Sequence, residues 1–599
     1  MSPAPGSPAG GPSRKAQGVA LALLAALVYL PSLRNGFVFD DHTLLLRSPL
    51  VRGPLWPYWF STRPLDYQPV SYTLLWLGWR LFGTWAPGYH ALDLACQVAV
   101  VLLLWRVLRR LAIPGAWLGA AIFALHPVGV PSVAWISETR NLVSAALALF
   151  SFELYLRDDE APAKARLLGS LGAFAAAILA KGSVVVLPVF LLGAGWWRRG
   201  RLHRADFART LPFFALALLS GLVTIWFQWS KAMVDVAAEP LVARLDGAGW
   251  IMALYLWKAL VPTNLMLVYP RWEAGNVALS FAATLAVVCA VAGAWMLRRR
   301  VRGPFAWLAG VVVATLPVSG IVPMAWHLMA PISDHLQYLA LMPTSAALGA
   351  AVTLLPGSRA ARALAGAALL AAFGTSTFER CAVFRSDETL WADNLRRNPG
   401  AEVVHAELAE LARERGDAEA ARRELLEAAR LTSDPAAAHL DRGQVALERG
   451  ALSEAAGEFA EAARLSPSTS GGVRGLAECL DRMGRRPEAI AGLRDLLARL
   501  PDDADARAQL GVLLAHDGDL EGAVRELERA AALRPGDLVL EQRLAVLLVA
   551  VGRRPEALQH IARALDRSAP DAQVHQVLAG ALEEAGLRRE AALERAEER

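Results

Sequence analysis

The sequence is poor in cysteine and carries little net charge for its length. Its 599 residues include four cysteines, which are widely scattered at Cys96, Cys289, Cys381 and Cys479. This scatter excludes a disulfide framework and the paired spacing of a zinc site. The formal net charge is +5, and arginines clustered between apolar segments supply much of the basic content. Nucleic acid is therefore not indicated as a partner.

Long apolar runs are absent from the C-terminal part of the chain. Before about residue 380, apolar segments of membrane length follow one another, whereas Ala, Leu, Glu and Arg dominate afterwards. The contrast predicts an all-α protein in three parts. Residues 1–18 form a flexible N-terminus, 19–378 a polytopic membrane domain, and 384–599 a soluble helical domain.

Eleven membrane crossings are predicted, and the short basic loops between them set their orientation. They are expected at 17–34, 88–110, 113–126, 140–157, 166–180, 182–197, 210–230, 279–297, 304–319, 335–355 and 360–378. The loops then place the N-terminus in the cytoplasm and the C-terminal domain outside it. Segment 250–269 is interpreted as re-entrant or lying on the outer surface, and 69–82 as an interfacial helix.

Two adjacent carboxylates, Asp40 and Asp41, stand where the first crossing reaches water. Such a pair at a membrane boundary is costly to place and suggests a functional site, although a solvated loop that ends the helix is an equal alternative. Further polar residues are expected on the same face: His90, Asp93, His126, Glu138, Arg140, Lys181, Asp334 and Tyr338. Each alone would be explained as a helix cap or a snorkelling charge. Together they suit a site that activates a hydroxyl and holds an anionic phosphate.

The C-terminal domain repeats with a period of 34 residues. Glycines recur at this spacing at positions 416, 450, 484, 518, 552 and 586, and an alanine follows each glycine five residues later. This is the tetratricopeptide period, in which glycine turns the chain and alanine lets the second helix pack closely. Six repeats forming a superhelix that binds a peptide or protein are predicted. The five histidines of this domain are interpreted as surface residues.

The membrane part resembles the transmembrane and tetratricopeptide-repeat O-mannosyltransferase family, of the glycosyltransferase-C superfamily, in a bacterial-type form. The motifs that carry the resemblance are Phe39-Asp40-Asp41, Ser48-Pro49-Leu50-Val51-Arg52-Gly53, Gln68-Pro69-Val70-Ser71-Tyr72, Gly88-Tyr89-His90, His126-Pro127, Val133-Ala134-Trp135-Ile136-Ser137-Glu138, Arg140-Asn141, Ala180-Lys181-Gly182, Tyr255-Leu256-Trp257-Lys258, Tyr269-Pro270 and Asp334-His335-Leu336-Gln337-Tyr338-Leu339. The sequence departs from the family pattern at Asn141, where an Asp is expected, and at His335, where an Arg is usual.

The resemblance implies transfer of a sugar, mannose in this family, from a polyprenyl-phosphate donor to Ser or Thr of exported proteins. Asp40 would be the general base, Asp41 would orient the hydroxyl or the sugar, and Arg140 and Lys181 would stabilise the departing phosphate. No cofactor is assigned, and a divalent metal is left open. The bilayer, a bacterial inner membrane by this resemblance, and the exported acceptor bound by the repeats would be the other partners.

A non-catalytic membrane scaffold is the alternative function. Its repeats would recruit partners for envelope assembly or secretion, and the repeat domain fits both functions equally well. A transporter is a weaker third alternative, because it would need charges near the bilayer midplane rather than at helix ends.

Overall fold

The computed structural model describes residues 13–230, 241–271, 277–322, 324–534, 537–565 and 571–597. Every element within these ranges is a helix, as the sequence predicts. The chain divides into two units, Met1–Arg47 with Leu55–Pro399 and Ser48–Pro54 with Gly400–Arg599. The division falls after Pro399 rather than before residue 384, because helix α17 (Asp387–Arg397) packs within the first unit.

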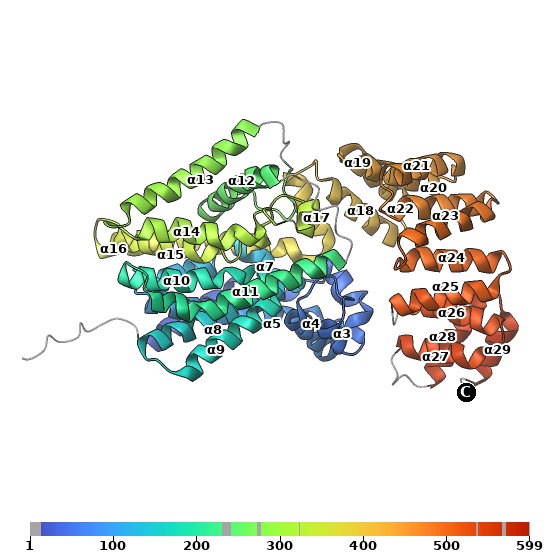
Figure 1. The fold of residues 1–599 in the computed structure, drawn as a ribbon, viewed down its shortest axis with the longest axis horizontal. Helices are drawn as coiled ribbons and strands as arrows, with labels where there is room; N and C mark the ends of the chain where they lie inside the picture. Colours follow the sequence, from blue (N-terminus) through green and yellow to red (C-terminus); the bar gives the residue numbers. More distant parts are fainter. Residues whose placement is uncertain are drawn as a thin grey trace, which may run out of the picture. The chain divides into compact units, whose positions relative to one another are not determined.

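The first unit is a bundle of helices that lie side by side in Figure 1. Its helices are α1 (Arg14–Val28), α3 (Trp56–Phe60), α4 (Pro69–Phe82), α5 (Ala86–Arg110), α6 (Ala116–Ala124), α7 (Val130–Ala134), α8 (Thr139–Glu160), α9 (Lys164–Ala180), α10 (Leu187–Arg199), α11 (Arg204–Ser230), α12 (Leu241–Leu260), α13 (Val277–Leu297), α14 (Gly303–Thr315), α15 (Leu341–Leu354), α16 (Arg359–Arg380) and α17. Short helical turns connect them, among them η2 (His42–Leu46), η4 (Ile136–Glu138), η5 (Gly182–Val186) and η9 (Asp334–Gln337).

Each predicted crossing overlaps one of these helices, and residues 69–82 form the single helix α4. Three helices of the described ranges are long and apolar enough to cross a bilayer: Ala86–Arg110, Arg204–Phe227 and Arg359–Arg385. The pair Ala116–Ala124 and Pro127–Ala134, bent by 51°, would make a fourth if it is one span. Along α11, Leu211, Leu218 and Leu222 are 57–66% exposed. Such outward apolar side chains are typical of a helix in apolar surroundings.

Small residues allow the closest approach within the bundle, between α6 and α15. A Cβ atom added to Gly349 of α15 would lie 2.5 Å from the backbone nitrogen of Gly119 in α6. Between α8 and α9, the hydroxyls of Ser151 and Ser170 each donate to the other residue's carbonyl at 2.8 Å. Glycine contacts and interhelical serine hydrogen bonds are the features by which membrane helices associate.

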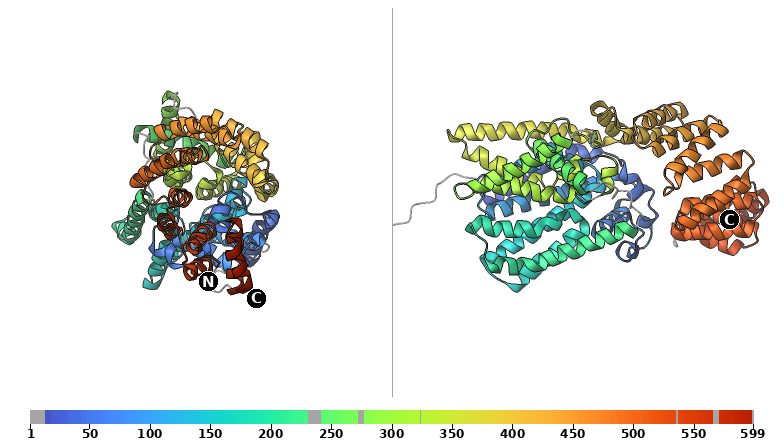
Figure 2. Two further views of the ribbon diagram at one scale, coloured as in Figure 1. Left: turned by 90° about the vertical axis from the view of Figure 1, so that its right-hand side faces the viewer. Right: turned by 45° about the horizontal axis from the view of Figure 1, so that its top comes forward.

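The described residues between 400 and 597 form six consecutive helix pairs, and Figure 2 draws these helices from two further directions. They are α18 (Glu402–Glu414), α19 (Ala418–Leu431), α20 (Pro435–Glu448), α21 (Leu452–Leu465), α22 (Gly471–Arg482), α23 (Arg486–Arg499), α24 (Ala504–His516), α25 (Leu520–Leu533), α26 (Leu538–Ala550), α27 (Arg554–Leu565), α28 (Asp571–Glu584) and α29 (Arg588–Glu597). The other segment of the second unit, Ser48–Pro54, contains the short helix α2 (Pro49–Arg52). All six repeated glycines have φ between 75° and 91°, a left-handed conformation that glycine adopts without strain. All six repeated alanines are fully buried. The predicted 34-residue register is therefore confirmed.

The interpretation of the repeat histidines as surface residues is wrong for four of the five. His405, His439, His560 and His575 keep 12–24% of their side-chain exposure, and each contacts a glutamate nineteen positions away at 2.6–2.7 Å. The nineteen-residue spacing joins the two helices of one repeat, so these side chains link helices rather than face solvent. His516 is 55% exposed, as expected.

Candidate active site

The loop before η2 turns the two adjacent carboxylates in opposite directions. Asp40 keeps 35% of its side-chain exposure, whereas Asp41 is fully buried. Asp41 accepts hydrogen bonds from the backbone N–H of Val38 at 3.0 Å and of Ser137 at 2.7 Å, and also from the Ser137 hydroxyl. Asp41 therefore joins this loop to η4 and is closed off from solvent.

Burial dominates the electrostatics of Asp41. It raises the pKa of this carboxyl to about 7, although the hydrogen bonds from Ser137 and Val38 act in the other direction. Burial also raises the pKa of Asp40, against the opposing charge of Arg140. Asp40 is therefore a stronger base than a freely solvated aspartate.

Helix α17 holds the same loop from the other side. The Asp387 carboxylate accepts the backbone N–H of Phe39 at 2.7 Å and contacts Nε2 of His42 at 2.7 Å. Phe39 has φ +48°, an uncommon conformation for a residue other than glycine. Its ring packs edge-on against Trp391 of α17, with centroids 5.2 Å apart. These contacts fix the residue that immediately precedes Asp40.

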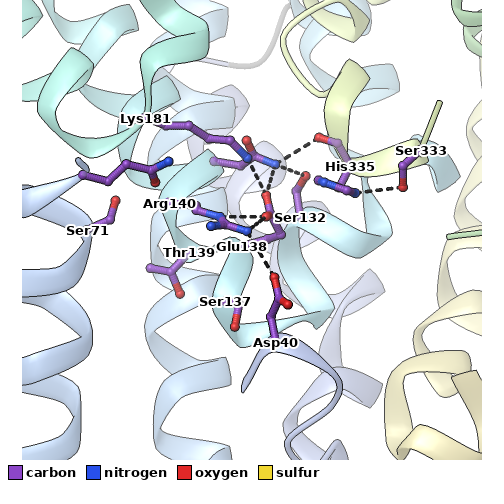
Figure 3. A network of polar contacts seen from close by, with 12 residues as sticks. Asp40, Ser71, Ser132, Ser137, Glu138, Thr139, Arg140, Lys181, Ser333 and His335 are labelled. Atoms are coloured by element: carbon purple, nitrogen blue, oxygen red, sulfur yellow. Dashed lines mark hydrogen bonds and ion pairs between the residues drawn. The ribbon is translucent and has the colours of Figure 1, made fainter. Parts of the chain in front are cut away.

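A fully buried glutamate, Glu138, lies at the centre of the site (Figure 3). Its carboxylate contacts Nη2 of Arg140 at 2.7 Å and Nζ of Lys181 at 2.8 Å. Burial would raise the pKa of Glu138, but the charges of Arg140 and Lys181 outweigh it and hold the pKa at about 2. The glutamate therefore stays ionised at physiological pH and keeps both cations in place.

Arg140 connects this buried carboxylate to Asp40. The arginine contacts Asp40 at 3.6 Å and Asp66 at 4.0 Å, and it is 18% exposed. Figure 3 shows the guanidinium between Asp40 and Glu138. In the described part of the chain, Lys181 forms its one ion pair with Glu138. The partly exposed Asp40 carboxylate thus lies close to Arg140, and Arg140 and Lys181 both pair with the buried Glu138.

Three further side chains position these charges. The Ser71 hydroxyl of α4 donates to the carbonyl of Ala180, next to Lys181, at 2.7 Å. The Thr139 hydroxyl donates to Asp93 of α5 at 2.5 Å. The Asn141 amide donates to the Glu138 carboxylate and to the carbonyl of His335 at 3.0 Å. Both positions at which the sequence departs from the family pattern therefore meet beside Glu138.

The remaining predicted site residues lie inside the bundle with partners of their own. Nε2 of His90 is 3.4 Å from the carbonyl of Gly36, and Nε2 of His126 is 3.0 Å from that of Ala259. Tyr338 donates to Gln97. All three are at most 1% exposed, so the structure places them in the supporting core.

Asp334 belongs to a second polar cluster. It accepts hydrogen bonds from the Tyr269 hydroxyl at 2.7 Å and from Arg380 at 3.1 Å, and it is 2% exposed. Burial raises its pKa to about 6 despite the charge of Arg380. This closed arrangement ties η9 to the end of α16.

Sequence reasoning missed Asp66 and Asp387 as parts of the site, and it named Ser137 only as a member of a motif. Asp66 lies two positions before the motif that begins at Gln68, and Ser137 lies within the motif that ends at Glu138. These neighbouring motifs were the local signal for both residues. Asp387 lies 347 positions after Asp40 within a segment assigned to the repeats, and no local pattern marks it.

The arrangement can accept a proton at Asp40 and stabilise a negative charge near Arg140 and Lys181. In the described ranges, no group of three His, Cys, Asp or Glu side chains has the geometry to hold a metal ion. Asp40, Asp66 and Glu138 instead all contact the guanidinium of Arg140.

Tetratricopeptide-repeat family models match residues 407–469, 475–537 and 514–581. The second unit is a tetratricopeptide-repeat array. A thermophilic tetratricopeptide-repeat protein of Thermus thermophilus is 24% identical, covers 31% of this chain and all of its own, and has a TM-score of 0.27.

The chain is also similar to proteins named as O-mannosyl-transferases. It is 28% identical over 165 residues to Protein O-mannosyl-transferase F38B6.6 of Caenorhabditis elegans, covering 25% of this chain and 24% of the relative. It is 29% identical over 150 residues to Protein O-mannosyl-transferase Tmtc2 of Drosophila melanogaster, covering 22% of this chain and 16% of that one. The chain thus spans about a quarter or less of the length of these relatives.

Proposed function

We propose that this chain is a membrane protein O-mannosyltransferase that transfers mannose from a polyprenyl-phosphate donor to Ser or Thr of exported proteins. The observation that carries the proposal is the open Asp40 carboxylate beside Arg140, which shares Glu138 with Lys181. The similarity to proteins named O-mannosyl-transferases supports the same activity. The tetratricopeptide-repeat array would bind the acceptor.

In the proposed reaction, Asp40 accepts the proton of the acceptor hydroxyl as its oxygen attacks the anomeric carbon. The bond from that carbon to the phosphate oxygen breaks, and the configuration inverts. Arg140 and Lys181 stabilise the charge that the departing lipid phosphate gains. Asp41 acts indirectly, because it holds the loop that carries Asp40.

The proposal places the first unit in the bilayer, a bacterial inner membrane by the family resemblance. The N-terminus would be cytoplasmic, and the site and the repeats would lie on the opposite side. The basic residues of the predicted loops support this orientation. The polyprenyl chain would lie among the helices with its sugar at the outer interface.

Replacing Asp40 with asparagine tests the proposal, because it preserves the shape of the side chain and removes the proton acceptor. We expect transfer to fall by at least about a hundredfold, measured by intact-mass glycoproteomics of exported proteins. Asp502→Asn, an exposed site in the repeats, is the matched control and should transfer normally. Lys181→Ala should instead weaken donor binding by about 1.5–3 kcal/mol, the usual worth of a hydrogen bond to a charged group.

Identical glycan profiles in the wild type and Asp40→Asn would contradict the enzyme proposal. A wild type without transfer, and a cellular phenotype that survives both substitutions, would favour the scaffold.

A further inference from the structure

A large apolar cavity between α8, α10, α14 and α15 has no part in the proposed transfer. Its volume is about 990 Å³, at the upper end of the usual range for ligand cavities, about 300–1,000 Å³. Aliphatic and aromatic side chains form most of its wall, including Leu149, Phe190, Trp307 and Leu339. The cavity therefore suits a hydrocarbon chain.

The cavity follows α10 from one end to the other. Val184 lines it just before this helix and Trp197 lines it near the C-terminus, and thirteen helical residues span about 20 Å. Neither Lys181 nor Arg140 is part of the wall. The cavity is thus elongated and separate from the charges around Glu138.

Positive charge gathers at the end of the cavity beside the C-terminus of α10. Arg300 and Arg302 line this end, which we call the mouth of the cavity. Arg302 donates to the carbonyl of Trp197 at 2.8 Å, and neither arginine forms an ion pair with a carboxylate among the described residues. The nearby acidic side chains are already paired, Asp159 with Arg198 and Arg209 and Asp206 with Arg199. The charge of this mouth is therefore available to an anion.

Aromatic rings surround the same mouth. Trp196 stacks on Trp295 with centroids 6.0 Å apart, and Phe305 packs against both rings, at 5.2 and 4.7 Å. All three side chains line the cavity. Aromatic belts and basic residues together mark the headgroup level of a membrane protein.

We propose that the cavity binds an anionic phospholipid of the surrounding bilayer. Its phosphate lies at Arg300 and Arg302, and an acyl chain runs along α10 between α8 and α14. Basic pockets between membrane helices recognise anionic headgroups in this way. The polyprenyl donor fits less well, because its phosphate belongs beside Lys181, at the other end of α10. The site is thus separate from the residues of the proposed transfer reaction, and it rests on the membrane location in the proposed function.

Native mass spectrometry of the full chain extracted in mild detergent tests the charged mouth. We expect the wild type to retain added phosphatidylglycerol in preference to phosphatidylcholine. Arg300→Gln combined with Arg302→Gln should weaken phosphatidylglycerol binding by about tenfold or more, the effect of 1.4 kcal/mol. Arg299→Gln, an exposed arginine of the same loop that does not line the cavity, is the control and should retain the lipid.

An uncharged variant tests the apolar part of the site. Gly193 of α10 lines the cavity, and a Cβ added there would meet no atom within 4 Å. Gly193→Leu should therefore have no clash at its Cβ atom, occupy part of the cavity beside α10 and displace phosphatidylglycerol. Gly172→Leu in α9 is the matched control, because Gly172 has equal space and lies outside the cavity wall.

Three results would overturn the proposal. The first is equal retention of phosphatidylglycerol by the wild type and the double arginine variant. The second is equal binding of phosphatidylcholine and phosphatidylglycerol by the wild type. The third is displacement of phosphatidylglycerol by a polyprenyl phosphate that binds more tightly. The last result would assign the cavity to the donor. Loss of lipid in Gly193→Leu with an unchanged melting temperature would support the proposal.

Discussion

The charged groups at the site of the first unit differ from the surface ion pairs of the repeats. In the first unit, Glu138 and Asp41 are fully buried, and each holds parts of the chain that lie far apart in sequence. In the repeats, pairs such as Arg430 and Glu427 are three positions apart on one helix and mostly exposed, at 67% and 49%. A buried charge is stable only with its partners, whereas exposed pairs contribute little. The site of the first unit should therefore be sensitive to single charge changes, and the repeats should respond more to changes in packing than to the loss of a surface pair.

The largest effect should come from Glu138→Gln. The substitution leaves Arg140 and Lys181 close together without the carboxylate between them, and breaking a buried pair typically costs about 3–5 kcal/mol. Thermal unfolding of the full chain in lipid nanodiscs would show it. Glu410→Gln, in an exposed pair with Arg413, is the control. An equal, small shift of the melting temperature in both variants would contradict the proposed difference between the buried site and the surface pairs.

A packing change should have the next largest effect, this time in the repeats. Ala523 is fully buried between helices of the array, and overpacking such a contact typically costs about 1–3 kcal/mol. Ala523→Trp should accelerate hydrogen exchange in α24 and α25. Ala532→Trp, on the exposed side of α25, should leave exchange unchanged, and equal exchange in both variants would refute the close packing.

Acidification should reduce transfer in a range above that of an ordinary aspartate. Asp40 accepts a proton only when it is ionised, and burial raises its pKa, so the active form is lost as the pH falls through that raised value. Below it, the rate should fall by about tenfold per pH unit, as for a single ionisation. Glu138, with a pKa of about 2, does not titrate there. Asp41, with a pKa of about 7, also loses its charge as the pH falls, and because it holds the same loop its protonation should add to the loss. A profile that stays flat down to about pH 4, the ordinary pKa of an aspartate, with the protein still folded, would exclude Asp40 as the base.

The smallest effect should come from an exposed pair of the repeats. Arg430→Gln removes an ion pair that spans one turn of α19, and such pairs contribute little because solvent screens them. The melting temperature of Arg430→Gln should differ less from that of the wild type than the melting temperature of Ala523→Trp does. A larger shift in Arg430→Gln than in Ala523→Trp would mean that surface charge stabilises the repeats more than packing does.

The repeats could be predicted almost completely from the sequence. Each glycine turn and buried alanine depends on residues within the same or the adjacent 34-residue unit, so the period alone sets the register. Each predicted crossing of the first unit overlaps a helix, because apolar segments indicate them, whereas α12 was interpreted as a re-entrant or surface segment and α17 was assigned to the repeats. The histidine–glutamate pairs were missed, since their nineteen-residue spacing becomes a contact only when two helices pack.

The site required the tertiary structure. Composition and motifs indicated Asp40, Arg140 and Lys181, but they could not show that Asp40 faces outward while its neighbour is buried. Ser137 decides that difference by donating to Asp41, and Asp387 by holding the backbone of Phe39. These partners lie 96 and 348 positions away in sequence. Local periodicity carries no information at that distance, so only the packed bundle determines which carboxylate is available for chemistry.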